Sequence, residues 1–235
     1  KLDPNHASAH SSLGNILRDI GKLKEAEIST RKAIKLDPTH ANAHLNLGNI
    51  LRDIGKLEDA EVSTRKAIKL NPNNVNAHLN LGNILYDFGK LEEAEMSTLK
   101  AIKLNPNNAN AHLNLGNILY DFGKLEDAEV STRKAIELNP NFAYAYSNLG
   151  NILRDIGKLV EAEISTRIAI ELNPNHSNAY SNLANILKDI GKLEDAELST
   201  RKAIKLNPNN ANAHLNLGNI LRDIGKLVEA EISTR

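Results

Sequence analysis

Residues 43–72, AHLNLGNILRDIGKLEDAEVSTRKAIKLNP, decide the fold because the same pattern returns along the whole chain. Residues 41–74 and 109–142 differ at only four positions. The prolines follow one another at intervals of 34 residues and are Pro4, Pro38, Pro72, Pro106, Pro140, Pro174 and Pro208. A period in this range is typical of stacked helical units that form a solenoid rather than one globular core.

The first half of each repeat predicts a helix, from about Ala43 to Ile54 in the second repeat. Its apolar residues have the spacing of one helical face and are Ala43, Leu47, Ile50, Leu51 and Ile54. Gly55 is expected to end this helix, since glycine readily adopts the left-handed conformation found just after helices.

The second half predicts another helix, from about Leu57 to Leu70. Pro72 stops it, because proline cannot continue a helix, and Asn73 or Asn74 can cap the next one. The small residues Gly48 and Ala60 predict a close approach of the two helices. Each repeat is therefore expected to form a helical hairpin.

Composition excludes several classes of protein. The chain has 235 residues and a formal net charge of zero, which argues against a general nucleic-acid or anionic-membrane binder. It has no cysteine and no apolar run approaching the roughly 18 residues of a membrane span. Its first ten residues, KLDPNHASAH, lack the apolar core of a signal peptide. A cytoplasmic location is therefore expected.

The repeated pattern resembles the tetratricopeptide repeat family. Leu47, Gly48, Gly55, Ala60 and Pro72 stand at that family's spacings, as does Ala67. The resemblance implies an all-α, right-handed superhelical solenoid of antiparallel helix pairs whose first helices line a concave side. Residues 1–6 would be the tail of a preceding repeat and residues 7–235 a single solenoid domain. Its repeats would be 7–40, 41–74, 75–108, 109–142, 143–176, 177–210 and a truncated 211–235.

Two positions depart from the family pattern. The large aromatic residue usual early in the first helix is a histidine such as His44 in five repeats and a tyrosine in two. The aromatic residue usual in the second helix is a threonine, such as Thr64. Packing between helices is therefore expected to be lighter than in many relatives.

Rows of asparagine on the first helices are the candidate binding site. Positions 42, 46, 49 and 53 are separated by four, three and four residues, so they share one side of a helix, opposite the apolar side. Tyr86 and Tyr120, which replace a basic residue, are further candidates for ligand contact. The candidate residues are Asn42, Asn46, Asn49, Asp53, Asn76, Asn80, Asn83, Tyr86, Asp87, Asn110, Asn114, Asn117, Tyr120, Asp121, Asn148, Asn151, Asn182, Asn185, Asn216 and Asn219.

Asparagine costs about 0.6 kcal/mol relative to alanine inside a helix, so its recurrence needs a reason. An amide side chain carries both donors and an acceptor, as a peptide unit does, and can pair with main chain whatever the ligand sequence. The row resembles the asparagine ladder of the peptide-binding repeats attached to O-linked N-acetylglucosamine transferase. The resemblance implies a groove for an extended polypeptide segment.

Other interpretations stay open at this point. The asparagines are also compatible with scaffold residues that bond a neighbouring helix, since near-identical repeats multiply any tolerated residue. The chain is also compatible with a substrate-recruiting arm of a larger enzyme, such as a glycosyltransferase, or with a consensus-like or engineered array without a specific ligand. No catalytic residues, cofactor or metal site are expected, because every recurring polar residue recurs in nearly all repeats. Pairs such as His40 and His44 are expected to have packing roles.

Two further contact surfaces are predicted. Val160, Ile164 and Ile168, four residues apart on a second helix, form an apolar stripe that predicts a second interface with a protein partner. The alternative is partial burial between adjacent repeats, because every repeat is apolar at the middle place. Uncapped terminal repeats also predict end-to-end self-association.

Overall fold

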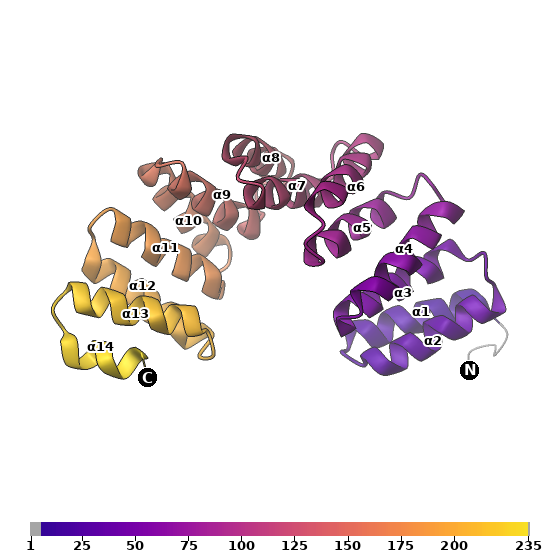
Figure 1. The fold of residues 1–235 in the computed structure, drawn as a ribbon, viewed down its shortest axis with the longest axis horizontal. Coiled ribbons are helices and arrows are strands. Elements are labelled where there is room, and N and C mark those ends of the chain that lie inside the picture. Colours follow the sequence, from indigo (N-terminus) through magenta and orange to yellow (C-terminus); the bar gives the residue numbers. More distant parts are fainter. Residues whose placement is uncertain (1–5, 235) are drawn as a thin grey trace. The chain divides into compact units, whose positions relative to one another are not determined.

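The structure is a computed structural model that describes the backbone of residues 6–234 and the side chains of residues 6–230 (Figure 1). Over these residues it consists of fourteen α-helices. They are α1 (Ala7–Asp19), α2 (Leu23–Leu36), α3 (Ala41–Ile54), α4 (Leu57–Leu70), α5 (Val75–Asp87), α6 (Leu91–Leu104), α7 (Ala109–Asp121), α8 (Leu125–Leu138), α9 (Ala143–Asp155), α10 (Leu159–Leu172), α11 (Ser177–Asp189), α12 (Leu193–Leu206), α13 (Ala211–Asp223) and α14 (Leu227–Thr234). Each repeat contributes two helices, as the sequence predicts, and the predicted all-α class is confirmed.

The helix boundaries follow local capping. The second helix of the second repeat, α4, has the predicted bounds, whereas α3 begins at Ala41, two residues before the predicted start. The reason is a cap: the His40 ring accepts a hydrogen bond through Nδ1 from the Ala43 N–H, at 3.1 Å. In the next repeat, Asn74 Oδ1 accepts from the Ala77 N–H at 3.1 Å, which confirms Asn74 as a cap.

Glycine makes the turn inside each hairpin. Gly55 has φ of 86°, in the left-handed region, and its N–H donates to the Arg52 carbonyl at 2.9 Å. The Lys56 N–H donates to the Leu51 carbonyl at 2.8 Å, so the turn satisfies two carbonyl groups at the end of α3. The prediction for Gly55 is confirmed.

The two helices of a hairpin meet closely at Gly48. A Cβ atom placed on Gly48 would lie 2.1 Å from Thr64 Oγ1 and 3.2 Å from the Ala60 carbonyl oxygen. Thr64 and Ala60 are fully buried. The predicted close approach is therefore confirmed, and the threonine that replaces a larger aromatic residue leaves room for it.

The core consists of small clusters that join successive repeats. In one of them, Leu47 and Leu51 of α3 pack with Ala60 of α4 and Ile84 of α5. Leu149, Leu153, Ala162 and Ile186 form the equivalent cluster from α9, α10 and α11. Each repeat thus buries its apolar face partly against the next, as a solenoid does.

The histidines of the first helices fasten the turns between repeats. His44 Nε2 donates to the Pro38 carbonyl at 3.0 Å, and His78 Nε2 donates to the Pro72 carbonyl at 2.9 Å. The expected packing role of His44 therefore includes a hydrogen bond to the loop that precedes its helix.

The chain divides into two compact units, Lys1–Ile118 and Leu119–Arg235, with the boundary inside α7. Each unit contains its own clusters of buried residues. The single domain predicted over residues 7–235 stays a prediction. In the described part of the chain, every helix is too short or too polar to cross a membrane.

Candidate functional site

In each unit, the predicted asparagines lie on one side of the first helices. This surface of each unit is called here the asparagine face. Asn42, Asn76 and Asn110 are exposed, whereas the residues four and seven places further on are half-buried. With their equivalents in later repeats, the half-buried residues are Asn46, Asn49, Asn80, Asn83, Asn114, Asn117, Asn148, Asn151, Asn182, Asn185, Asn216 and Asn219. The helical spacing of the sequence places these amides on one partly accessible side of their helices.

Neighbouring first helices are joined by amide–amide hydrogen bonds. Asn80 Nδ2 on α5 donates to Asn49 Oδ1 on α3 at 2.6 Å, and Asn114 on α7 donates in the same way to Asn83. In the second unit, Asn216 Nδ2 on α13 donates to Asn185 Oδ1 on α11 at 3.0 Å. Part of the asparagine pattern is therefore structural, as the scaffold interpretation predicts.

Two equivalent asparagines donate to a serine 35 residues earlier rather than to the asparagine 31 residues earlier. Asn46 Nδ2 donates to Ser11 Oγ at 2.9 Å, and Asn182 Nδ2 donates to Ser147 Oγ at 3.0 Å. The donor again belongs to the later repeat. Ser11 and Ser147 were not among the predicted residues, and the signal that reveals them is their spacing of 35 residues from an asparagine.

The amide–amide contacts occupy only part of each side chain. A primary amide has two N–H donors and a carbonyl with two lone pairs. The bond between Asn80 and Asn49 uses one donor of Asn80 and one lone pair of Asn49. The remaining hydrogen-bonding capacity of these half-buried side chains is the feature that suits an incoming main chain.

A second row of contacts runs along the ends of the first helices. Arg18 Nε lies 2.5 Å from Asp53 Oδ2, and Arg52 Nε lies 2.5 Å from Asp87 Oδ2. In the second unit, Arg154 pairs with Asp189 at 2.5 Å and Lys188 with Asp223 at 3.5 Å. These aspartates are therefore engaged by a residue 35 places earlier, a pairing that the sequence analysis missed.

Tyr120 takes the place of the basic residue in one of these pairs. Its hydroxyl donates to Asp155, and burial together with this hydrogen bond raises the pKa of Tyr120 to about 12. Phe122, two residues on, is half-buried, and Lys124 Nζ lies 4.7 Å from the centre of its ring. The tyrosine predicted to contact a ligand thus also joins two helices of the scaffold.

The asparagine face is hollowed in both units. A hollow of about 170 Å³ in the first unit is lined by Arg52, Asn83, Tyr86, Asp87 and Asn114, among others. A hollow of about 310 Å³ in the second unit is lined by Asn148, Asn151, Asn182, Asn185 and other polar residues. Predicted site residues from successive repeats therefore line common hollows.

The second helices carry an exposed apolar row. Val160 and Ile164 are exposed and Ile168 is half-buried. The residue at the middle place is more than half exposed in each repeat whose side chains are described, which fits partial burial between repeats as well as a contact surface. The middle residues are Ile28, Val62, Met96, Val130, Ile164 and Leu198. Ile232 lies outside the described side chains.

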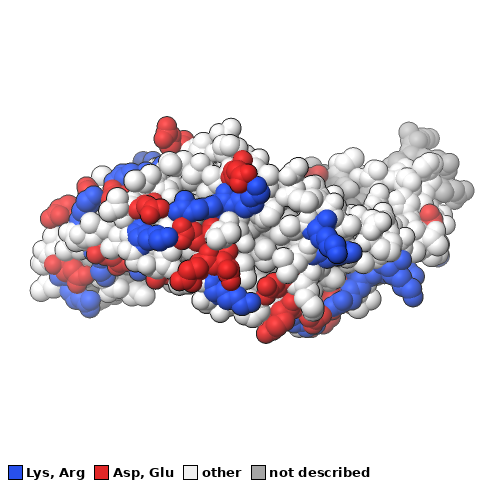
Figure 2. Space-filling view, turned by 90° about the horizontal axis from the view of Figure 1, so that it is seen from above, with Lys and Arg blue, Asp and Glu red and all other residues white. Residues whose placement is uncertain are grey.

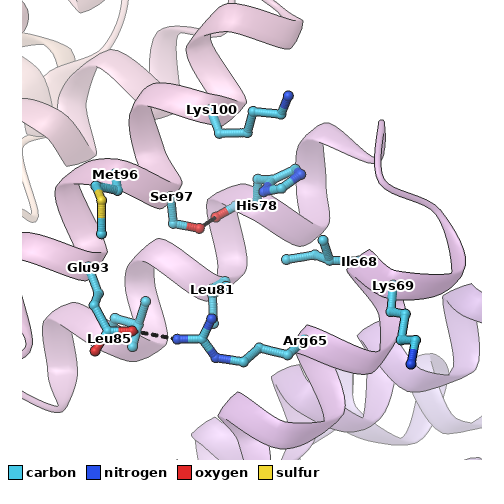
Figure 3. A pocket seen from close by; sticks show the side chains of 10 residues that line it. All are labelled: Arg65, Ile68, Lys69, His78, Leu81, Leu85, Glu93, Met96, Ser97 and Lys100. Atoms are coloured by element: carbon cyan, nitrogen blue, oxygen red, sulfur yellow. Dashed lines mark hydrogen bonds and ion pairs between the residues drawn. The ribbon is translucent and has the colours of Figure 1, made fainter.

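A hollow of about 410 Å³ lies beside Met96, between α4, α5 and α6 (Figure 3). Ile68, Leu81 and Leu85 line it with Met96. Arg65 at its edge donates to Glu93 at 2.5 Å, so this charge is already paired. Apolar surface is thus accessible on this face as well as polar surface on the asparagine face.

Charges of both signs are interspersed on the face shown in Figure 2. Glu61 illustrates the pattern: its carboxylate accepts from Arg65 on its own helix and from Lys90 of the next repeat, each at 2.8 Å. The hydrogen bond from Lys90 is the main cause that lowers the pKa of Glu61. Such pairs join successive repeats without forming a patch of one sign.

The described residues contain no group of three or more histidine, cysteine or acidic side chains placed to hold a metal ion. His6 and His40 accept hydrogen bonds from backbone N–H groups at helix starts.

Comparisons with known proteins agree with this architecture. The family profile described as TPR repeat matches residues 14–55, 48–89, 82–123 and 184–225. Profiles described as tetratricopeptide repeat match residues 109–142, 132–164 and 168–197. The comparison with curated proteins found no match.

Several solved structures have a similar fold. The crystal structure of the APC/C hetero-tetramer Cut9-Hcn1 matches with a TM-score of 0.86 and 18% identity, over 94% of this chain and 44% of that chain. The chain thus spans less than half of that relative. PilF of Pseudomonas aeruginosa matches with a TM-score of 0.79 and 21% identity, over 92% and 97% of the two chains.

A third structure is described as YrrB, a TPR protein with an unusual peptide-binding site. It matches with a TM-score of 0.59 and 27% identity, over 78% of this chain and 95% of that chain. The repeat pattern, the helical hairpins and the matching profiles lead to one conclusion: the chain belongs to the tetratricopeptide repeat family.

Proposed function

We propose that the chain is a non-catalytic interaction scaffold that binds an extended polypeptide segment on its asparagine face. The proposal is carried by one observation: half-buried amides recur on successive first helices, and their mutual hydrogen bonds use only part of their capacity. Each further hydrogen bond to main chain contributes about 1 kcal/mol, so affinity depends on several repeats acting together.

The spacing of the repeats suits such a ligand. Neighbouring helices pack about 8–10 Å apart, and an extended chain rises about 3.3 Å per residue. One repeat then corresponds to about three residues of ligand. The similarity to YrrB, described as having a peptide-binding site, supports a polypeptide ligand for this fold.

The test is binding to a peptide array before and after Asn80, Asn114 and Asn148 are replaced by alanine. We expect the triple variant to lose most binding while its helical circular dichroism is unchanged. The matched control replaces Lys32, Lys66 and Lys100, three exposed residues also one repeat apart on second helices. If the asparagine variant still binds peptide and the lysine variant does not, the binding site lies on the second helices and the proposal is contradicted.

We also propose that Val160, Ile164 and Ile168 form a second protein-contact surface. Val160 and Ile164 are exposed one helical turn apart, and contiguous exposed apolar patches mark contact sites. Replacing Val160 and Ile164 by serine should weaken capture of the partner and leave array binding by the asparagine face unchanged. Equal loss of both activities would contradict a separate surface.

A further inference from the structure

Two N-capping histidines occupy equivalent places but differ in their hydrogen bonds. In both rings Nδ1 accepts from a backbone N–H, at 3.1 Å for His40 and 3.4 Å for His176. The ring proton of the neutral form therefore lies on Nε2. His40 Nε2 has a partner, Ser8 Oγ, at 3.0 Å. His176 Nε2 is buried and has no hydrogen-bond partner among the described residues.

The cause is a substitution 32 residues upstream. Ser8 stands at that distance from His40, whereas Tyr144 stands at the same distance from His176. Tyr144 packs its ring against His176, with ring centres 4.5 Å apart, and offers no acceptor to Nε2. His176 is only 7% exposed, and burial lowers its pKa, so the ring is neutral near pH 7. The result is an uncharged N–H donor without an acceptor.

The Oγ atom of Ser181 is a second buried polar atom without a partner among the described residues. Ser11 and Ser147, at the equivalent place in other repeats, each accept from an asparagine 35 residues later. The asparagine at that distance from Ser181 is Asn216, which donates to Asn185 instead. Ser181 Oγ is therefore left buried without a hydrogen bond in the described chain.

Both unpartnered groups line the hollow of about 310 Å³ in the second unit. Ser147, Asn182 and Asn216 line it as well, and its described lining consists of uncharged residues. A buried polar group without a partner costs about 1–3 kcal/mol, which a ligand with the right groups recovers. An ionic ligand would lose its hydration here without meeting an opposite charge.

We propose that this hollow is a subsite for the carboxamide side chain of glutamine or asparagine in the bound segment. The assignment rests on the proposed function of the asparagine face. The ligand oxygen accepts from His176 Nε2 and from asparagine amides, and the ligand NH2 group donates to Ser181 Oγ. Tyr144, which is 57% exposed, lies over His176 and turns aside as the carboxamide enters.

The experiment titrates the full chain with three single-residue probes: the N-acetyl, N-methylamide derivatives of glutamine, glutamate and leucine. Nitrogen-15 spectra report the His176 ring and the backbone of Tyr144 and Ser181. We expect saturable chemical-shift changes with the glutamine probe. The glutamate and leucine probes should bind at least about fivefold more weakly than the glutamine probe, because each leaves at least one hydrogen bond unmade. Equal shifts from all three probes, or shifts elsewhere only, would overturn the subsite.

Two variants at Tyr144 sharpen the result. Tyr144→Ser gives His176 the acceptor that Ser8 gives His40, and should abolish the response to the glutamine probe while stability is kept. Tyr144→Phe keeps the ring, lacks the hydroxyl and should bind the probe as before. A response that survives Tyr144→Ser contradicts the role of His176.

The outcome is separable from that of the proposed function. One outcome is array binding that depends on Asn80, Asn114 and Asn148 but shows no preference for glutamine or asparagine. It would support the proposed function and contradict the subsite. A selective response to the glutamine probe without any array binding would support the carboxamide subsite and contradict peptide binding on the asparagine face.

Discussion

At the residue scale, the glycine of the helix contact sets how close the two helices of a hairpin lie. Gly48 faces Thr64, whereas the sixth repeat has Ala184 and Thr200 at the same places. Thr200 Oγ1 donates to the Ala196 carbonyl at 2.8 Å beside a fully buried Ala184. The threonine thus accommodates a methyl group in one repeat of this chain.

This precedent predicts the result of two substitutions at Gly48. Gly48→Ala should change the free energy of unfolding by less than about 1 kcal/mol, because the gain in helix propensity offsets the displacement of Thr64. Gly48→Val should destabilise by about 1–3 kcal/mol through overpacking. Urea denaturation measures both, and a large loss for Gly48→Ala would show that Thr64 lacks the freedom of Thr200.

The residue scale also shows where sequence reasoning succeeds and fails. Gly55 and Asn74 were predicted because their roles depend on their own backbone conformation or side chain. The cap at His40 was missed, since histidine is not among the preferred capping residues. The partners Ser11 and Ser147 were missed because they depend on how neighbouring repeats are offset, which a period of 34 does not reveal.

At the scale of elements, the hydrogen bond of Tyr120 to Asp155 joins α7 to α9. The folded chain holds the pKa of Tyr120 at about 12, above its ordinary value of 10.0, so folding favours the protonated hydroxyl. Its contribution to stability is complete below pH 10 and is lost as the pH rises through about 12. Ultraviolet titration of tyrosinate should show this late ionisation.

Asp155→Asn should move the titration of Tyr120 back toward the ordinary range, because the negative charge that opposes ionisation is removed. Tyr120→Phe should remove the late step altogether. A late step that persists in the phenylalanine variant would belong to another tyrosine.

The ion pairs between second helices predict an acid-sensitive contribution. The pKa of Glu61 is lowered, mainly by the hydrogen bond from Lys90, so its stabilisation is present above pH 4.5 and is lost as the pH falls through the lowered value. Glu61→Gln should therefore destabilise by at most about 1 kcal/mol at pH 7 and have no effect in strong acid. Urea denaturation at both pH values checks this.

Glu58→Gln is the matched control, because Glu58 is an exposed carboxylate on the same helix. It should have little effect at either pH. An equal loss from both variants would show that overall charge, and not the bridge between repeats, determines the result.

Element boundaries were predictable because periodicity, glycine and proline act within a few residues. The ion pairs of the aspartates were not predictable in this way, although both partners of each pair are present in the sequence. Arg18 and Asp53 lie 35 residues apart, and only stacking of α1 on α3 brings them together. The predicted groove residues thus have scaffold partners that no pattern within one helix discloses.

At the scale of the whole molecule, the first repeat of the 235-residue polypeptide exposes apolar side chains that inner repeats bury. Ile16 is 58% exposed, whereas Ile50 at the equivalent place is fully buried. Leu227 in the last repeat is also exposed, whereas Leu193 at the equivalent place is half-buried. We expect this polypeptide to self-associate with increasing concentration, since such faces normally stack on another repeat.

Sedimentation velocity over a wide concentration range tests this expectation. Ile16→Glu together with Leu227→Glu should return the polypeptide to a monomer. Val62→Glu, at an exposed apolar residue of an inner repeat, should not change the association. A strict monomer at the highest concentration would contradict self-association.

The fold was predictable as a whole because each of the seven copies of the pattern predicts the same helical hairpin. The site was predictable only as a surface. What distinguishes one repeat from another, such as Tyr144 above His176, arises from single substitutions whose effect depends on a residue in the neighbouring repeat.

The two rows of contacts on the first helices run in opposite senses. In the asparagine row the N–H belongs to the later repeat, as from Asn80 to Asn49, whereas in the charged row the donor belongs to the earlier one, as from Arg18 to Asp53. The hydrogen-bonding pattern of this surface is therefore directional from one repeat to the next. A bound strand would meet a different order of donors and acceptors if its N-to-C direction were reversed, so the surface favours one chain direction even where no side chain is contacted.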